Sequence, residues 1–102
     1  MRAVLGTSTH IPPERWADLK LRANKKFDVY ANGILLYELY TNVRAFANVK
    51  CPEIKVEVMS GARPSLDAMP VEVPMTIMNV IRECWHQDPA DRPEFVGGEF
   101  LI

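Results

Sequence analysis

A run of apolar side chains from Asp28 to Thr41 constrains the fold of this chain more than any other feature. Its large apolar residues are Val29, Tyr30, Ile34, Leu35, Leu36, Tyr37, Leu39 and Tyr40. At 100° per residue these side chains point in every direction around a helix, and only Asn32 and Glu38 interrupt them. The run is too long for a typical strand, so it predicts a helix that is buried on all sides, with Asp28 as its N-cap.

The chain is small for a helix that needs complete burial. It has 102 residues, 48% of them hydrophobic and 25% charged, which is an average composition for one globular domain. A chain of this size buries only about two-thirds of the surface that its unfolded form exposes. The sequence therefore raises the question of whether its other segments can cover the central run.

Prolines divide the rest of the chain into short segments. Residues 1–14 contain a Pro-Pro pair and are predicted to be irregular, followed by a short helical turn over Glu14–Leu19. A weaker helical pattern over 46–59 is split by a proline, whereas Val73–Trp85 is clearly amphipathic and predicts a helix packed on its apolar side. Asp88 precedes a proline and is typical of an N-cap, so a last helix is expected from there.

Charge and length exclude several classes of function. Twelve Lys and Arg residues against thirteen Asp and Glu residues give a formal charge of −1, and only Lys20–Lys26 concentrates basic residues, so we expect no nucleic-acid binding. We expect no membrane span, since the longest apolar run falls far short of roughly 20 residues. Without a signal-peptide pattern, Cys51 and Cys84 are expected to be free thiols in a cytoplasmic protein.

Individual residues offer little from which to build an active site. The two histidines, His10 and His86, do not have the spacing of zinc ligands, so we expect no metal site. No Gly-x-Ser-x-Gly elbow, Gly-x-Gly-x-x-Gly loop or Walker loop is present to hold a nucleophile or a phosphate. Asp88 and Asp91 lie at a predicted helix start, where the helix dipole already explains a carboxylate.

Four motifs in order nevertheless resemble the C-terminal lobe of protein kinases. They are Gly6-Thr7-Ser8-Thr9-His10-Ile11-Pro12-Pro13-Glu14, the run from Asp28 to Leu39, Gly61-Ala62-Arg63-Pro64, and Cys84-Trp85-His86-Gln87-Asp88-Pro89-Ala90-Asp91-Arg92-Pro93. The first resembles the end of the activation segment, the second the start of the central helix F, and the last the signature between helices H and I. The order and the spacing of the four motifs also match the family.

The resemblance implies a mainly α fold: a partial kinase C-lobe with helices F, G, H and I, the preceding activation-segment and P+1 loop, and no N-lobe β-sheet. It implies a partial kinase domain over 1–96 and a divergent tail over 97–102, because Gly97 and Gly98 fall where helix I should continue. The Gly-x-Arg-Pro and Cys-Trp features, with Pro-Pro-Glu, are similar to receptor-interacting serine/threonine kinases of the tyrosine-kinase-like branch.

Substrate contacts are the first roles that the resemblance implies. Thr7 would bond the catalytic-loop Asp, which favours serine/threonine specificity, and Ile11 and Pro12 would line the pocket for the substrate residue after the acceptor. His10 stands at the position of the motif's usual Tyr, next to that pocket.

Structural roles follow for five further residues. Glu14 and Arg92 would form a buried ion pair, as the family's Ala-Pro-Glu glutamate does with the arginine before the last proline. Asp28 would accept hydrogen bonds from backbone N–H groups of the catalytic loop. Trp85 and Gly33 would have structural roles in packing.

Phosphoryl transfer by a kinase needs a Gly-rich loop, a strand lysine with its helix-C glutamate, a catalytic-loop Asp and Asn, and the Asp-Phe-Gly that holds magnesium. None of these motifs is in the sequence. We therefore expect no cofactor on this chain, with ATP and Mg²⁺ only in a full-length parent, and no catalysis by the chain alone.

Three hypotheses stay open at this point. The chain is part of an active serine/threonine kinase, or part of a pseudokinase or stand-alone interaction module, or an unrelated helical protein with accidental matches. In the first two cases it would bind a protein substrate or partner through the P+1 loop and the 46–62 region. In the family, helix E and the catalytic loop cover one side of helix F, so one side of the 28–41 helix is expected to be bare.

Overall fold

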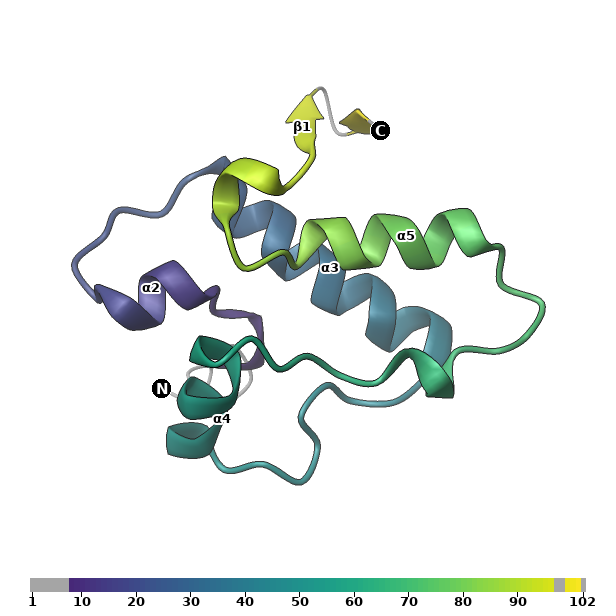
Figure 1. Ribbon diagram of the computed structural model, residues 1–102, viewed down its shortest axis with the longest axis horizontal. Coiled ribbons are helices and arrows are strands. Elements are labelled where there is room, and N and C mark those ends of the chain that lie inside the picture. The colour runs from purple at the N-terminus through teal and green to yellow at the C-terminus, as the bar shows by residue number, and fades with distance from the viewer. Residues whose placement is uncertain (1–7, 97–98, 102) are drawn as a thin grey trace.

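A computed structural model describes residues 8–96 and 99–101 of the chain (Figure 1). The elements in chain order are the 3₁₀ turn η1 (Ser8–His10), α2 (Pro13–Ala17), α3 (Lys25–Thr41), α4 (Cys51–Met59), η2 (Leu66–Ala68), α5 (Met75–Cys84), η3 (Pro89–Asp91), β1 (Glu94–Val96) and β2 (Glu99–Leu101). The prediction of a mainly helical fold is confirmed. The strands of the described residues are β1 and β2, which pair antiparallel with Glu94 opposite Leu101.

Helix α3 runs through the centre of the molecule, and α5 packs along it (Figure 1). The prediction that Asp28 caps this helix is wrong, because α3 begins one turn earlier. The side chain of Asn24 accepts hydrogen bonds from the backbone N–H groups of Lys26 and Phe27, which places the N-cap there. Asn42 then ends the helix in the left-handed conformation, with φ 60°.

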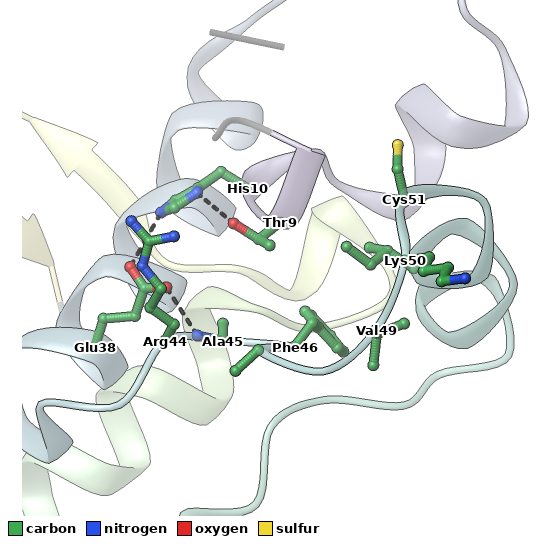
Figure 2. A pocket seen from close by; sticks show the side chains of 11 residues that line it. Thr9, His10, Glu38, Arg44, Ala45, Phe46, Val49, Lys50 and Cys51 are labelled. Atoms are coloured by element: carbon green, nitrogen blue, oxygen red, sulfur yellow. Dashed lines mark hydrogen bonds and ion pairs between the residues drawn. The ribbon is translucent and has the colours of Figure 1, made fainter. Parts of the chain in front are cut away.

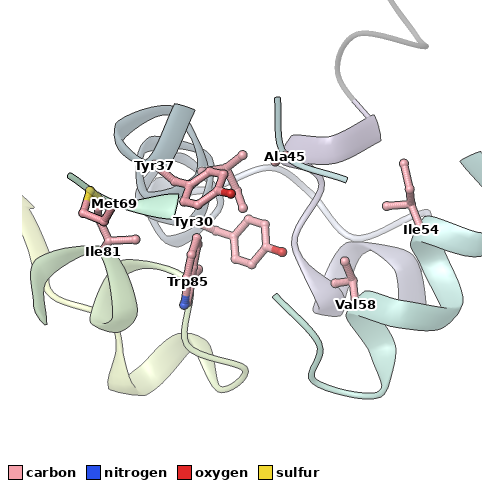
Figure 3. Packing of buried hydrophobic residues seen from close by; sticks show 9 residues of the cluster. Tyr30, Tyr37, Ala45, Ile54, Val58, Met69, Ile81 and Trp85 are labelled. Atoms are coloured by element: carbon pink, nitrogen blue, oxygen red, sulfur yellow. The ribbon is translucent and has the colours of Figure 1, made fainter. Parts of the chain in front are cut away.

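The core forms on the side of α3 that faces α5 and α4. Its buried residues are Tyr30, Ile34, Tyr37, Ala45, Ile54, Val58, Met69, Ile81 and Trp85 (Figure 3). Gly33 allows α3 and α5 to approach closely, since a Cβ atom at this position would lie 2.8 Å from the Cβ of Cys84. The rings of Tyr37 and Trp85 pack with their centroids 6.0 Å apart.

The opposite side of α3 carries a stripe of poorly covered residues, which we call the α3 stripe: Asp28, Asn32, Leu35 and Leu39. Their spacing places them on one face of the helix. Leu35 is 43% exposed and Leu39 is 68% exposed, so the prediction of a helix buried on all sides is wrong. The prediction that one side lies bare is confirmed, because the described segments cover only the other faces.

The other predicted helices form with shifted ends. Pro52 does not split the helix predicted over 46–59. It occupies the first turn of α4, where its missing N–H costs no hydrogen bond. The amphipathic segment forms α5, with Val80, Ile81 and Cys84 buried. None of the helices in the described part of the chain is long and apolar enough to cross a membrane.

The prediction of a last helix after Asp88 is wrong. Asp88 does cap a turn, since its carboxylate accepts a hydrogen bond from the N–H of Ala90, but the turn η3 ends after Asp91. Arg92 is extended, with φ −82° and ψ 150°. The proline that follows disfavours the helical conformation of Arg92, and strand β1 then begins.

Candidate functional site

A buried ion pair joins the beginning and the end of the described chain. Arg92 Nη1 donates to Glu14 Oε2 at 2.7 Å, and Arg92 Nη2 donates to Glu14 Oε1 at 2.8 Å. Arg92 also donates to the carbonyl oxygens of His86 and Lys26, both at 2.9 Å. The arginine side chain is 0% exposed and the glutamate is 17% exposed, so this fork-shaped pair fixes α2 against the start of α3 and the C-terminal turn.

Tyr30 lies between two guanidinium groups beside this pair. The central guanidinium carbons of Arg63 and Arg92 each lie 5.2 Å from the centroid of the Tyr30 ring. Burial raises the pKa of Tyr30, and the two arginines oppose that shift. Hydrogen bonds fix the Arg63 side chain, because it donates to the carbonyl oxygen of Trp85 at 2.8 Å and to Gln87 Oε1 at 2.7 Å.

All four sequence motifs therefore meet at one place in the fold. Glu14 comes from the first motif, Tyr30 from the second, Arg63 from the third, and Arg92 and Trp85 from the fourth. Sequence reasoning did not single out Tyr30 and Arg63 for this centre. A tyrosine one turn from the start of an apolar helix and an arginine in a loop look ordinary until the fold brings them together.

A cavity of about 610 Å³ opens beside the C-terminal end of α3 (Figure 2). It lies between η1, the C-terminal end of α3, the 42–50 loop and the start of α4. The lining residues are Thr9, His10, Glu38, Arg44, Ala45, Phe46, Ala47, Val49, Lys50, Cys51 and Ile54. The cavity thus borders on the segment that precedes α2 and on the loop that precedes α4.

Glu38 connects the walls of this cavity. Its Oε2 accepts a hydrogen bond from the backbone N–H of Ala45 at 2.8 Å, and its Oε1 lies 3.8 Å from His10 Nε2 (Figure 2). His10 Nδ1 lies 3.0 Å from Thr9 Oγ1, within hydrogen-bonding distance. One carboxylate from α3 therefore fixes the 42–50 loop by a hydrogen bond and also lies beside η1.

Phe46 has an unusual backbone conformation in the 42–50 loop. Its φ is 53°, in the left-handed region, which costs of the order of 1 to 3 kcal/mol for a residue that is not glycine. Phe46 lines the cavity and is also packed against the core cluster. Strain of this kind persists only where the surroundings over-determine the conformation, as the Glu38 bond to Ala45 does here.

The residues predicted to contact substrate lie close to the cavity where they are described. Thr7 lies outside the described residues. Ile11 is half-buried and Pro12 is buried, and both follow η1 directly, but neither lines the cavity. Asp28 is exposed on the α3 stripe, on a different face of α3 from the core.

The two cysteines are both free. Cys51 is half-buried at the cavity, whereas Cys84 is fully buried against α3. Burial raises the pKa of the Cys84 thiol to about 12. Only Cys51 is therefore placed to react with a thiol reagent near neutral pH.

A helical unit in which these four motifs converge on a buried Glu–Arg pair has the arrangement of a protein kinase C-terminal lobe. The family model for protein tyrosine and serine/threonine kinases matches residues 6–97. The chain therefore belongs to the protein tyrosine and serine/threonine kinase family, and the resemblance drawn from the motifs is confirmed.

Similar proteins include several serine/threonine kinases. Ankyrin repeat and protein kinase domain-containing protein 1 of Mus musculus is 35% identical over 98 residues, which cover 92% of this chain and 13% of that protein. RGS domain-containing serine/threonine-protein kinase A of Dictyostelium discoideum is 33% identical over 96 residues, which cover 87% of this chain and 8% of that protein. Receptor-interacting serine/threonine-protein kinase 1 of Homo sapiens is 30% identical over 95 residues, which cover 92% of this chain and 14% of that protein. The chain thus spans less than a fifth of each of these relatives.

Proposed function

We propose that the chain forms the substrate-facing part of a serine/threonine protein kinase domain and transfers no phosphate by itself. The observation that carries this proposal is the cavity between η1 and the 42–50 loop. It adjoins the segment whose sequence resembles the end of the activation segment, which is where a kinase of this family meets its protein substrate. Two of the relatives named above are serine/threonine kinases by name, which supports the same substrate class.

The proposal assigns separate roles to the two sides of the molecule. Thr7, Ile11 and Pro12 would contact a protein substrate next to the cavity. Asp28 would hold the catalytic loop of a complete kinase domain, and its exposure on the α3 stripe supports this role, since a carboxylate buried there would have no room for a partner. The Glu14–Arg92 pair would fix the substrate-facing segment relative to α3.

ATP and Mg²⁺ belong to the proposal only for a complete kinase domain. The motifs that hold the phosphates and the metal in kinases do not occur among these 102 residues. The proposal also places the protein in the cytoplasm, where its two free thiols would stay reduced.

Amide hydrogen exchange with and without a serine-containing peptide tests the proposed function. The peptide is expected to slow exchange in η1, in the 42–50 loop and at the start of α4, and to leave α5 unchanged. A phosphoryl-transfer assay with the same peptide and MgATP is expected to give no product above background. Protection confined to α5, or phosphopeptide formed by the purified chain, would contradict the proposal.

A second candidate function rests on the exposed side of α4. Val56 is 67% exposed and Met59 is 40% exposed, so the 46–62 region presents apolar surface that a partner protein could cover. In this case the chain would act as part of a pseudokinase or as an interaction module. A Val56→Ser/Met59→Ser variant would then lose the partner protein. A variant with substitutions at the cavity, such as Arg44→Glu/Lys50→Glu, would still bind it.

A further inference from the structure

The charges around the cavity are unbalanced. Glu38 is the one acidic residue of the lining, and both of its carboxylate oxygens already face partners in η1 and the 42–50 loop. Arg44 and Lys50 are exposed at the same cavity. Neither cation forms a hydrogen bond or an ion pair through its side chain with any residue in the described ranges. Two positive charges are thus free to meet a ligand.

The floor of the cavity is apolar. Phe46 and Val49 contribute hydrophobic surface between the two cations (Figure 2), and Ile54 adds to the apolar lining. Phe46 is held in place by its packing against the core and by the Glu38 bond to the preceding residue. The cavity therefore combines a fixed apolar surface with a positively charged rim, which is a complementary surface for an apolar side chain that has an acidic neighbour.

We propose that this cavity binds a protein segment in which an apolar residue lies next to Asp or Glu. The inference rests on the proposed function, because it names the substrate class for the same face of the molecule. Acidic residues on the two sides of the apolar residue gain one ion pair each, with Arg44 and with Lys50. A basic neighbour meets two like charges against the single carboxylate of Glu38, one oxygen of which already accepts a hydrogen bond from Ala45, so the cavity discriminates against basic substrates.

Three synthetic peptides test this inference. They are identical except that the residues next to one leucine are Asp, Asn or Lys. The dye-labelled chain is held at nanomolar concentration, because exposed apolar residues such as Leu35 and Leu39 favour self-association of more concentrated protein, and each peptide is titrated. The Asp peptide is expected to bind about fivefold tighter than the Asn peptide, which is within the range that two exposed ion pairs supply, and the Lys peptide is expected to bind most weakly.

A charge-reversed variant locates the effect at the cavity. Arg44→Glu/Lys50→Glu is expected to reverse the order, so that the Lys peptide binds tightest. The matched control Lys20→Glu/Lys25→Glu makes the same change in net charge at two exposed lysines outside the cavity, and it is expected to keep the preference for Asp. Circular dichroism checks that both variants keep the helix content of the parent chain.

Cys51 supplies an independent readout of occupancy. Because Cys51 lines the cavity and Cys84 is buried, a bound peptide is expected to slow the reaction of Cys51 with a thiol reagent. Equal affinities for the three peptides would overturn the inference and leave the proposed function standing. A preference for Asp that survives Arg44→Glu/Lys50→Glu would also overturn it. If no peptide binds or protects Cys51, the proposed function fails as well.

Discussion

Removing Glu14 is expected to destabilise the fold strongly, because it leaves the Arg92 guanidinium buried without its counter-charge. Glu14→Ala deletes the two hydrogen bonds of 2.7 and 2.8 Å while Arg92 stays 0% exposed. Breaking a buried pair from one side costs about 3 to 5 kcal/mol. We expect the lower end, about 3 kcal/mol, because Glu14 is 17% exposed and Arg92 keeps its two carbonyl acceptors.

The assay is the urea dependence of proteolysis at nanomolar chain concentration, which measures the free energy of unfolding without requiring concentrated protein. Glu72→Ala is the matched control, since Glu72 is exposed and lies in a loop. Surface changes of this kind usually stay within about 0.5 kcal/mol. A free energy of unfolding for Glu14→Ala within about 1 kcal/mol of the Glu72→Ala value would refute the reasoning about the ion pair.

Two further variants test the packing and the surface, and two measurements test the cysteines. Gly33→Ala is expected to cost about 1 to 3 kcal/mol in the urea assay, because the added Cβ would lie 2.8 Å from the Cβ of Cys84. Leu35→Lys/Leu39→Lys is expected to reduce light scattering and the binding of a hydrophobic dye, and to leave the free energy of unfolding unchanged. At pH 8 a thiol reagent is expected to modify Cys51 and not Cys84 in the folded chain. Since burial raises the pKa of Cys84 from 9.0 to about 12, its contribution to stability is present below pH 9 and decreases as the pH rises from 9 towards 12, which urea titrations at several pH values measure.

The apolar run predicted the central helix but not its boundaries. Asn24 caps α3 because its side chain reaches two N–H groups, whereas Asp28, an equally good capping residue, lies one turn inside the helix. Local sequence contains two acceptable caps, and packing of Phe27 into the core favours the earlier one. Helix ends depend on such tertiary contacts, so pattern alone places them only to within about a turn.

In the segment that begins at Asp88, the cap is predicted correctly but the helix is not. Asp88 followed by proline forms a capped turn as predicted, but the helix does not continue. Arg92 is drawn into the core by Glu14, and the proline after it keeps Arg92 extended. The Glu14–Arg92 pair was predicted from the family motifs. A glutamate and an arginine far apart in sequence do not by themselves indicate a contact.

The candidate site was predicted in part. The first motif supplies Thr9 and His10 to the lining of the cavity, but Ile11 and Pro12 do not line it, and the 42–50 loop that does contains no recognisable motif. Arg44, Phe46 and Lys50 form a site only because the fold places their loop beside η1, with Glu38 bonded to the backbone of Ala45. Such a site depends on long-range contacts that no local pattern encodes.

We propose that these 102 residues face protein substrates and bind no nucleotide. Isothermal titration calorimetry of MgATP into the purified chain tests this proposal. We expect no saturable heat up to millimolar nucleotide, because the motifs that bind phosphate and metal in a kinase are absent from the sequence. Stoichiometric binding at micromolar concentration would show that the proposal is wrong.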